Sequence, residues 1–285
     1  MVKARLIVLA ACALLAASCQ YRYSWQRYKI DGHRTGVGVP TADNVVQALG
    51  TVDDSLYHAP NGTTFPKGSA TYAAAAEMIA VQPQMARLKE VIAVSAREMS
   101  ANAPESELSN WLIDHLMEET ARKTKRKVDV GISNFGGIRV DLPKGDVLMD
   151  DLVSMFPFRN YLCYVALKGA DLQNLFEQFA ASRVQVLGGV KFVVTDHKID
   201  TLLVGGKPID PEKTYGVATI DFLLDGGDGL SVARNAKELI ITDELIIDAM
   251  LPYARSYAAT GKKIDYSKDG RVVIRRALKQ KEDEQ

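Results

Sequence analysis

Three short segments contain side chains whose combination could bind a flat, polar small molecule. Residues 134–139 read Asn-Phe-Gly-Gly-Ile-Arg, residues 156–158 read Phe-Pro-Phe, and residues 222–229 read Phe-Leu-Leu-Asp-Gly-Gly-Asp-Gly. Aromatic rings stack on a heterocycle, a carboxylate accepts hydrogen bonds from a sugar diol, and a guanidinium pairs with an anion. Each segment alone is weak evidence, because a single phenylalanine is usually core and a single Gly-Gly is usually a turn.

Taken together and in this order, the segments resemble the 5'-nucleotidase C-terminal domain, the substrate-holding half of a nucleotide hydrolase. Residues 206–219, Gly-Lys-Pro-Ile-Asp-Pro-Glu-Lys-Thr-Tyr-Gly-Val-Ala-Thr, also resemble the family's stretch that leads to its second aromatic residue. The similarity runs from about Pro83 to about Ile274. It implies an α+β fold, a mixed β-sheet domain with flanking helices.

The resemblance implies a role for each polar or aromatic residue. Phe158 and Phe222 match the two rings that sandwich the base, and Asp228 matches the acid that accepts hydrogen bonds from the ribose hydroxyls. Asn134 matches an amide that contacts the base, and Arg139 matches an arginine that contacts the ribose and faces the phosphate. Stacking tolerates different bases, so we expect little base selectivity.

Three glycine pairs complete the predicted site. The resemblance implies that two of them let the backbone approach the ligand, and that the third turns the chain so that Asp228 points inward. In that order the pairs are Gly136 with Gly137, Gly188 with Gly189, and Gly226 with Gly227.

One departure from the family pattern concerns a cation. Relatives usually have an arginine just before a helix that starts Glu-Ser-x-Leu-x-Asn, where this chain has Ala103 and Pro104. One phosphate or ribose contact is therefore missing. Arg159 or Arg183 could replace it in space, but the sequence favours an ordinary surface arginine at each position.

The sequence predicts no metal ligand and no catalytic residue in this chain. Family members perform hydrolysis in a separate N-terminal metallophosphatase domain, with an Asp-x-His pattern near its start and Gly-Asn-His later. Asp31-Gly32-His33 fits the first pattern, but Asp-Gly is also a turn and no Gly-Asn-His follows. We expect no cofactor here, and divalent metals only in a partner metallophosphatase.

Two functions of different classes follow from these observations. The chain could be the nucleotide-holding half of a split 5'-nucleotidase, paired with a metallophosphatase polypeptide. Alternatively, it could be a non-catalytic surface lipoprotein that captures nucleosides, a reading favoured by the missing arginine. An autonomous hydrolase conflicts with the absent metal ligands.

The N-terminus predicts export and a lipid anchor. Lys3 and Arg5 precede an apolar run, residues 6–17, that is too short to span a bilayer and ends in Leu-Ala-Ala-Ser-Cys19. This resembles the lipobox of bacterial lipoproteins, with cleavage after residue 18 and acylation of Cys19. An ordinary secretory signal is the alternative. We expect a protein anchored to the bacterial cell envelope, at the outer membrane.

Composition after cleavage excludes two classes of protein. The mature chain would have 33 basic and 35 acidic residues, which is no footprint for nucleic-acid binding. Apart from the acylated Cys19, it would keep one thiol, Cys163, so a disulfide framework is excluded. Cys163 lies in an apolar run of strand length, residues 161–167, and we expect it to be a buried small hydrophobe.

Patterns of apolar residues predict four regions and the main elements. The regions are a signal peptide (1–18), an N-terminal hairpin and linker region (19–82, with 40–69 as loop), the main domain (83–276) and a charged, disordered tail (277–285). Predicted helices cover residues 70–80, a segment starting at 104 with an apolar stripe that includes His115, a segment around 172–179, and most of 239–258. Predicted strands are 91–95, 128–133, 161–167, 189–194, 201–204, 215–220 and 271–274.

Overall fold

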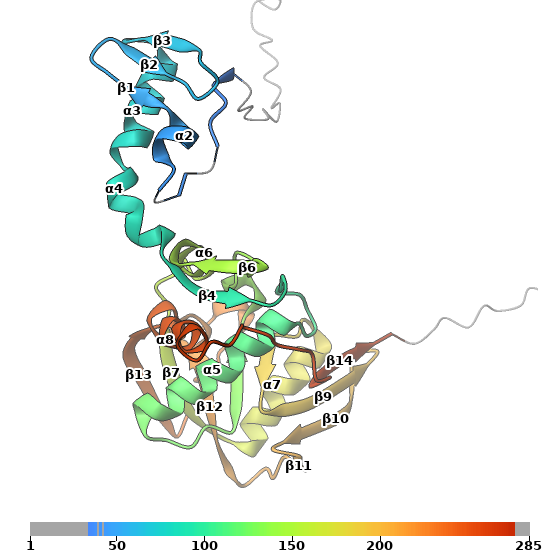
Figure 1. Cartoon of the computed structure of the whole chain (residues 1–285). Helices are drawn as coiled ribbons and strands as arrows, with labels where there is room; N and C mark the ends of the chain where they lie inside the picture. The colour runs from blue at the N-terminus through green and yellow to red at the C-terminus, as the bar shows by residue number, and fades with distance from the viewer. Residues whose placement is uncertain (1–33, 39, 42, 277–285) are drawn as a thin grey trace, which may run out of the picture. The chain divides into compact units, whose positions relative to one another are not determined.

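The computed structural model describes residues 34–276, with the exception of residues 39 and 42 (Figure 1). The chain divides into two compact units, Met1–Gln82 and Pro83–Gln285. Cys19, Asp31, His33, most of the predicted hairpin and the tail from residue 277 lie outside the described residues. No described helix combines the length and apolar character needed to cross a bilayer.

The first unit is a small folded body, and the prediction of a loop over residues 40–69 is wrong. It contains a three-stranded antiparallel sheet in the order β1-β2-β3, with Tyr57 and Phe65 stacked in its core. Strands of two or three residues separated by Gly, Pro, Asn and Asp have too little periodicity to be recognised. The elements are α2 (Val45–Leu49), β1 (Thr51–Val52), β2 (Leu56–His58), β3 (Thr64–Pro66) and α3 (Ala70–Ala80), and α4 (Gln82–Met85) begins at the last residue of this unit.

The second unit is the mixed α and β domain that the sequence predicts. Its sheets have the strand orders β13-β7-β12-β5-β8, β11-β10-β9-β14 and β4-β6. The elements are η2 (Ala86–Lys89), β4 (Val91–Ser95), α5 (Glu107–Thr124), β5 (Val130–Ser133), η3 (Phe135–Gly137), β6 (Gly145–Leu148), α6 (Met149–Met155), β7 (Tyr161–Lys168), α7 (Gly169–Ala181), β8 (Val186–Gly188), β9 (Val190–Thr195), β10 (Lys198–Val204), β11 (Lys207–Pro208), β12 (Thr214–Ile220), η4 (Asp221–Leu223), η5 (Gly227–Gly229), β13 (Glu238–Leu245), α8 (Ile246–Ala259) and β14 (Val272–Arg275).

The five-stranded sheet brings distant segments to one edge. β7 and β12 are antiparallel, with Leu162 opposite Ile220, so β7 begins where β12 ends. β12 and β5 are parallel, with Ala218 beside Gly131, so β5 ends at the same edge. The loops after β5, before β7 and after β12 therefore meet at this edge.

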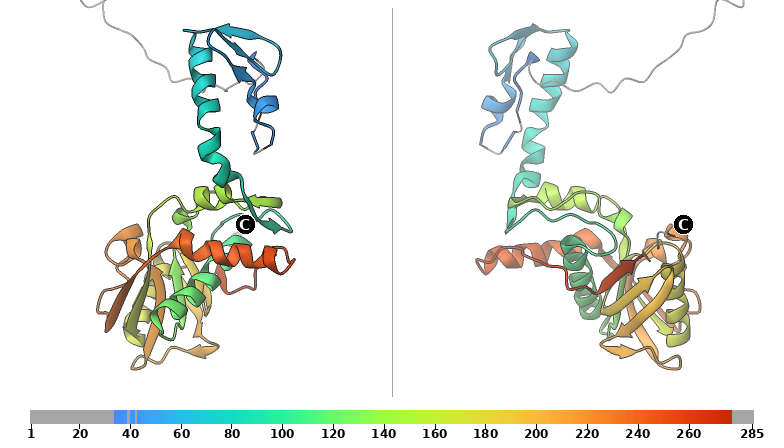
Figure 2. Two further views of the ribbon diagram at one scale, coloured as in Figure 1. Left: turned by 60° about the vertical axis from the view of Figure 1, so that its left-hand side comes forward. Right: turned by 90° about the vertical axis from the view of Figure 1, so that its right-hand side faces the viewer.

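The helices that pack on the five-stranded sheet are those whose sequences have an apolar stripe. α5 packs on β5, β7, β8 and β12 and against α8, while α7 contacts β7, β12 and β10 (Figure 2). The predicted start of α5 at residue 104 is wrong, because the helix begins at Glu107. Ser106 caps it, and Ser106 and Ser109 each accept a backbone hydrogen bond from the other.

The segment 239–258, predicted to be mostly helical, is helical only from residue 246 onward. β13 runs to Leu245 and α8 begins only at Ile246. Residues alternate in exposure along β13, with Leu239 and Ile241 on the exposed side of an edge strand. The run of Leu, Ile and Ile that looked like a helix face is thus one strand with apolar residues on both faces.

His115 is packed on the α5 stripe, as the sequence predicts. Its ring stacks on Tyr253 with 4.2 Å between centroids and meets the edges of Trp111 and Tyr257. Burial lowers the pKa of the imidazole, although Glu118 and Asp114 partly oppose that shift. His115 is therefore neutral in the folded protein near pH 7.

This packing predicts a pH dependence of stability. As pH falls below about 6.5 the imidazole of an unfolded chain becomes protonated, whereas folded His115 takes up its proton only at lower pH, so the unfolded state binds more protons. Stability is lost as pH falls, at a rate of at most about 1.4 kcal/mol per pH unit. We expect His115→Phe to lose less stability than the native chain between pH 7.5 and 5.5 in urea unfolding. Equal losses in both proteins would show that His115 titrates alike when folded and unfolded.

Candidate functional site

Asn134 and Asp228 meet at the sheet edge where the three loops converge. Asn134 follows β5 directly and is only 5% exposed, and its Nδ2 donates to Asp228 Oδ2 at 2.9 Å. Asp228 has the left-handed φ of 51°, which asparagine and aspartate tolerate better than other side chains. The structure thus joins two predicted site residues that lie 94 positions apart.

Asn134 also has unused hydrogen-bonding capacity. Its buried Oδ1 has no hydrogen-bond partner within the described part of the chain. A Cβ at Gly137 would lie 2.6 Å from that oxygen, whereas a Cβ at Gly136 would make only ordinary contacts. Gly137 therefore leaves room for the Asn134 amide, whose Oδ1 remains a buried acceptor without a partner among the described residues.

The loop that carries Asp228 depends on a close backbone approach. A Cβ at Gly227 would lie 1.9 Å from the carbonyl oxygen of Phe222, and Gly226 has a φ of 95°. Only glycine fits both positions. The tight turn places Asp228 beside the segment that carries Phe222.

Asp221 ties the two aromatic segments together. Its Oδ1 accepts from the backbone N–H of Phe222 at 2.9 Å and from that of Tyr161 at 3.1 Å, and Tyr161 begins the strand that follows Phe158. Sequence reasoning missed Asp221. The available signal was its position between a buried strand and the exposed aromatic residue, where an acid can bind free backbone N–H groups.

Both rings of the predicted pair are open to solvent. Phe158 is 49% exposed and Phe222 is 45% exposed, although phenylalanine is usually buried. Within the part of the chain that the structure describes, neither ring packs on another aromatic side chain. The rings are therefore free to stack on a ligand.

Arg139 brings a positive charge to Phe158. Its guanidinium carbon lies 5.9 Å from the centroid of the Phe158 ring, and its Nη1 donates to the Gly136 carbonyl at 3.3 Å. The backbone N–H of Arg139 also bonds the carbonyl of Met155, which connects the 134–139 loop to the end of α6. The exposed guanidinium can turn toward an anionic ligand group.

Gly188 and Gly189 do not reach this edge. Gly188 pairs with Gly131 in the middle of β5, and Gly189 lies farther toward the opposite end, where a Cβ would be 2.3 Å from the Asp129 carbonyl oxygen. A Cβ at Gly188 would lie 2.6 Å from the sulfur of Met117 on α5. The geometry makes both residues packing positions rather than the ligand contacts that the resemblance implies.

Substitution of Gly188 separates packing from binding. We expect Gly188→Ala to lower the free energy of unfolding by about 1–3 kcal/mol, because α5 must shift to admit the methyl group. Adenosine affinity of the folded variant should match that of the native chain, measured by calorimetry alongside thermal unfolding. A folded Gly188→Ala protein that had lost adenosine affinity would return this glycine to the site.

Arg183 lies near Ala103 and Pro104, the position where relatives usually have an arginine. Ala103, Pro104 and Arg183 line one cavity of about 690 Å³, which Arg275 and Arg276 also line. Arg159 is exposed beside Phe158. The structure thus places a cation near the departure from the family pattern.

Nucleophilic and metal chemistry have few candidate residues here. Cys163 is buried in β7, and burial raises the pKa of its thiol to about 12, so it is a packed thiol rather than a thiolate. Across residues 34–276, with the two gaps noted above, no three His, Cys, Asp or Glu side chains form a group that could hold a metal.

Curated relatives are similar to this chain over one part of their length. Apyrase of Tabanus yao is 30% identical over 169 residues, which is 52% of this chain and 30% of the apyrase. Protein UshA of Escherichia coli K12 is 30% identical over 138 residues, which is 47% of this chain and 25% of UshA. The chain spans less than a third of the length of these relatives.

Solved structures show the same fold. A 5'-nucleotidase precursor from Thermus thermophilus superimposes with a TM-score of 0.62 at 22% identity, over 73% of this chain and 43% of that one. A Haemophilus influenzae NAD nucleotidase superimposes with a TM-score of 0.53 at 15% identity, over 78% of this chain and 48% of that one. These matches confirm the predicted α+β fold class.

Membership of a family rests on a match to more than half of the chain. The family model described as "5'-nucleotidase, C-terminal domain" matches residues 84–235, which contain every residue of the candidate edge. The resemblance predicted from three short segments is confirmed. This chain belongs to the family of the 5'-nucleotidase C-terminal domain.

Proposed function

We propose that the chain holds a nucleoside or nucleotide for a 5'-nucleotidase-type hydrolysis that a metallophosphatase polypeptide performs. Its site consists of Phe158 and Phe222 for the base, Asp228 for the ribose hydroxyls, Asn134 for a polar edge of the base, and Arg139 for the phosphate side. The carrying observation is the hydrogen bond from Asn134 to Asp228 at the sheet edge whose loops also carry two half-exposed rings.

Chemical complementarity supports this assignment. A nucleoside offers two flat faces, a diol and hydrogen-bonding groups on its base, and the edge offers rings, a carboxylate and an amide with a free acceptor. A phosphate adds negative charge, with which the exposed guanidinium of Arg139 near Phe158 can pair. Base identity contributes little, because stacking accepts every base.

The metal-dependent step belongs to another domain in this proposal. The sequence before the matched region offers Asp31 and His33 as one Asp-x-His pattern and no later Gly-Asn-His. A two-metal centre needs several Asp, His and Asn ligands.

We place the protein outside the cytoplasm, anchored to the cell envelope through an acylated Cys19.

A second candidate function is nucleoside capture without hydrolysis. It is favoured by Ala103 and Pro104 at the position where relatives usually have an arginine. A chain that only captures nucleosides should bind adenosine as tightly as AMP, because it gains nothing from a phosphate contact. A holder for hydrolysis should bind AMP more tightly through Arg139.

The test combines binding with phosphate release on the mature, lipid-free chain. Calorimetry with adenosine and AMP should show binding of both, while the chain alone with Mn²⁺ or Zn²⁺ releases no phosphate from AMP. Adding a metallophosphatase from the same cell should start phosphate release. Metal-dependent release by the pure chain would overturn the division of roles, and failure to bind either ligand would overturn the site.

A further inference from the structure

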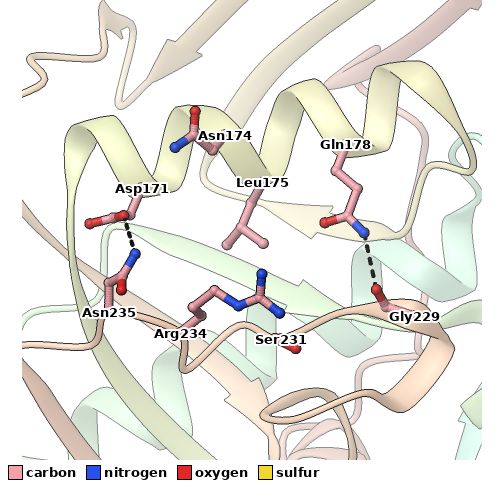
Figure 3. A pocket seen from close by; sticks show the side chains of 8 residues that line it. All are labelled: Asp171, Asn174, Leu175, Gln178, Gly229, Ser231, Arg234 and Asn235. Atoms are coloured by element: carbon pink, nitrogen blue, oxygen red, sulfur yellow. Dashed lines mark hydrogen bonds between the residues drawn. The ribbon is translucent and has the colours of Figure 1, made fainter.

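A second polar cavity lies between α7 and the chain that follows Asp228. It has a volume of about 220 Å³, and neither Phe158, Phe222 nor Asn134 lines it (Figure 3). Its lining residues come from the first three turns of α7 and from the segment that starts at the end of η5, and they are Asp171, Asn174, Leu175, Gln178, Gly229, Ser231, Arg234 and Asn235. The cavity is thus separate from the proposed nucleoside site.

Two hydrogen bonds hold the walls of this cavity in place. Asn235 Nδ2 donates to Asp171 Oδ1 at 2.8 Å, and Gln178 Nε2 donates to the Gly229 carbonyl at 3.0 Å, as the dashed lines in Figure 3 mark. Between these two bonds, buried Leu230 and Val232 anchor the segment in the core. The cavity therefore has fixed walls rather than loose loop edges.

Arg234 is the unpaired cation of the cavity. Figure 3 shows its side chain lying across the pocket below Leu175. Among the described residues, its guanidinium has no carboxylate partner and no hydrogen-bond acceptor. A guanidinium offers a planar fork of N–H donors that fits the oxygens of a phosphate or carboxylate.

The carboxylate of Asp171 favours an anion that carries a hydroxyl group. Asp171 lines the cavity, and Asn235 occupies its Oδ1, which leaves Oδ2 as an acceptor without a partner among the described residues. The residue lies in the first turn of α7, where the helix dipole favours a negative charge. An anion without a proton would be repelled by Asp171, whereas an anion with a hydroxyl group could donate to it.

We propose that this cavity is a binding site for a small phosphate anion. Inorganic phosphate carries at least one P–OH group near neutral pH, which donates to Asp171 while its other oxygens accept from Arg234. Sulfate has the same shape but no proton at that pH. The inference does not require the proposed nucleoside site, since the two share no side chain.

The experiment titrates the mature chain with inorganic phosphate and with sodium sulfate near pH 7, by calorimetry and by backbone amide chemical shifts. We expect phosphate to bind and sulfate to bind at least about tenfold more weakly. Shift changes should centre on residues 229–235 and on α7. Absence of phosphate binding at about 10 mM, or equal binding of both anions, would overturn the proposal.

Three variants locate the binding. Arg234→Gln should weaken phosphate binding at least about tenfold, and Asp171→Asn should bring the phosphate and sulfate affinities within about threefold of each other. Arg183→Gln, in the other arginine-lined cavity, is the matched control and should bind phosphate normally. Loss of binding in Arg183→Gln with normal binding in Arg234→Gln would move the site away from this cavity.

One more variant separates this proposal from the proposed function. Phe222→Ala should bind phosphate like the native chain, because its ring does not line the cavity. If the native chain binds phosphate but not adenosine, the cavity stands and the nucleoside site fails. If it binds adenosine but not phosphate, the opposite holds.

Discussion

Phe222→Ala should weaken adenosine binding by roughly 5- to 150-fold, which corresponds to the loss of one base stack worth about 1–3 kcal/mol. The ring is 45% exposed, so its removal takes little from the core. The loop should keep its shape, because the Phe222 N–H and carbonyl, which contact Asp221 and Gly227, are backbone groups. Calorimetry against adenosine measures the change.

Leu239→Ala is the matched control for that experiment. Leu239 is equally exposed at 45%, but it lies on the edge strand β13 rather than at the predicted site. We expect it to bind adenosine with native affinity. Similar affinity losses in the two variants would mean that the assay reports general stability, and native affinity in Phe222→Ala would remove Phe222 from the site.

The second large loss of adenosine affinity is expected when the acceptor for the ribose hydroxyls is changed. Asp228→Asn should weaken adenosine binding about 10- to 150-fold, since hydrogen bonds to a charged acceptor contribute about 1.5–3 kcal/mol. Asparagine keeps an oxygen that can accept from Asn134 Nδ2, so the link between the two loops can persist. Asp225→Asn, an exposed acid in the same loop, serves as the control and should bind normally.

A modified ligand assigns the effect of Asp228 to the diol. In the native chain, 2',3'-dideoxyadenosine should bind as weakly as adenosine binds to Asp228→Asn. In Asp228→Asn, loss of the two hydroxyls should have little further effect, because their acceptor has already changed. Additive losses from variant and ligand would instead show that Asp228 and the ribose hydroxyls do not interact.

Local patterns predicted much of the main domain, because its long elements have clear periods. The apolar stripe of α5 and the run of β7 are each long enough to distinguish helix from strand. Short strands of the first unit and the junction of β13 with α8 were missed. β13 is an edge strand that exposes Leu239 and Ile241. Apolar residues therefore lie on both of its faces, and the sequence does not alternate between apolar and polar residues.

The candidate site was predictable in part, for a physical reason. Asn134, Phe222 and Asp228 lie in the loops after β5 and β12, Phe158 lies shortly before β7, and these loops meet at one edge of the sheet. The prediction that Gly188 contacts the ligand is wrong. A glycine that makes room for a helix side chain and a glycine that makes room for a ligand look alike in sequence. Only the register of β5 with β8 separates the two cases.

We propose that the rings of Phe158 and Phe222 hold a nucleoside base beside the linked pair Asn134 and Asp228. A crystal structure of the mature chain with AMP tests it most directly. We expect density for the base between the two rings, with the ribose hydroxyls within hydrogen-bond distance of the Asp228 carboxylate. Density for AMP at any other place, with both rings left bare, would contradict it.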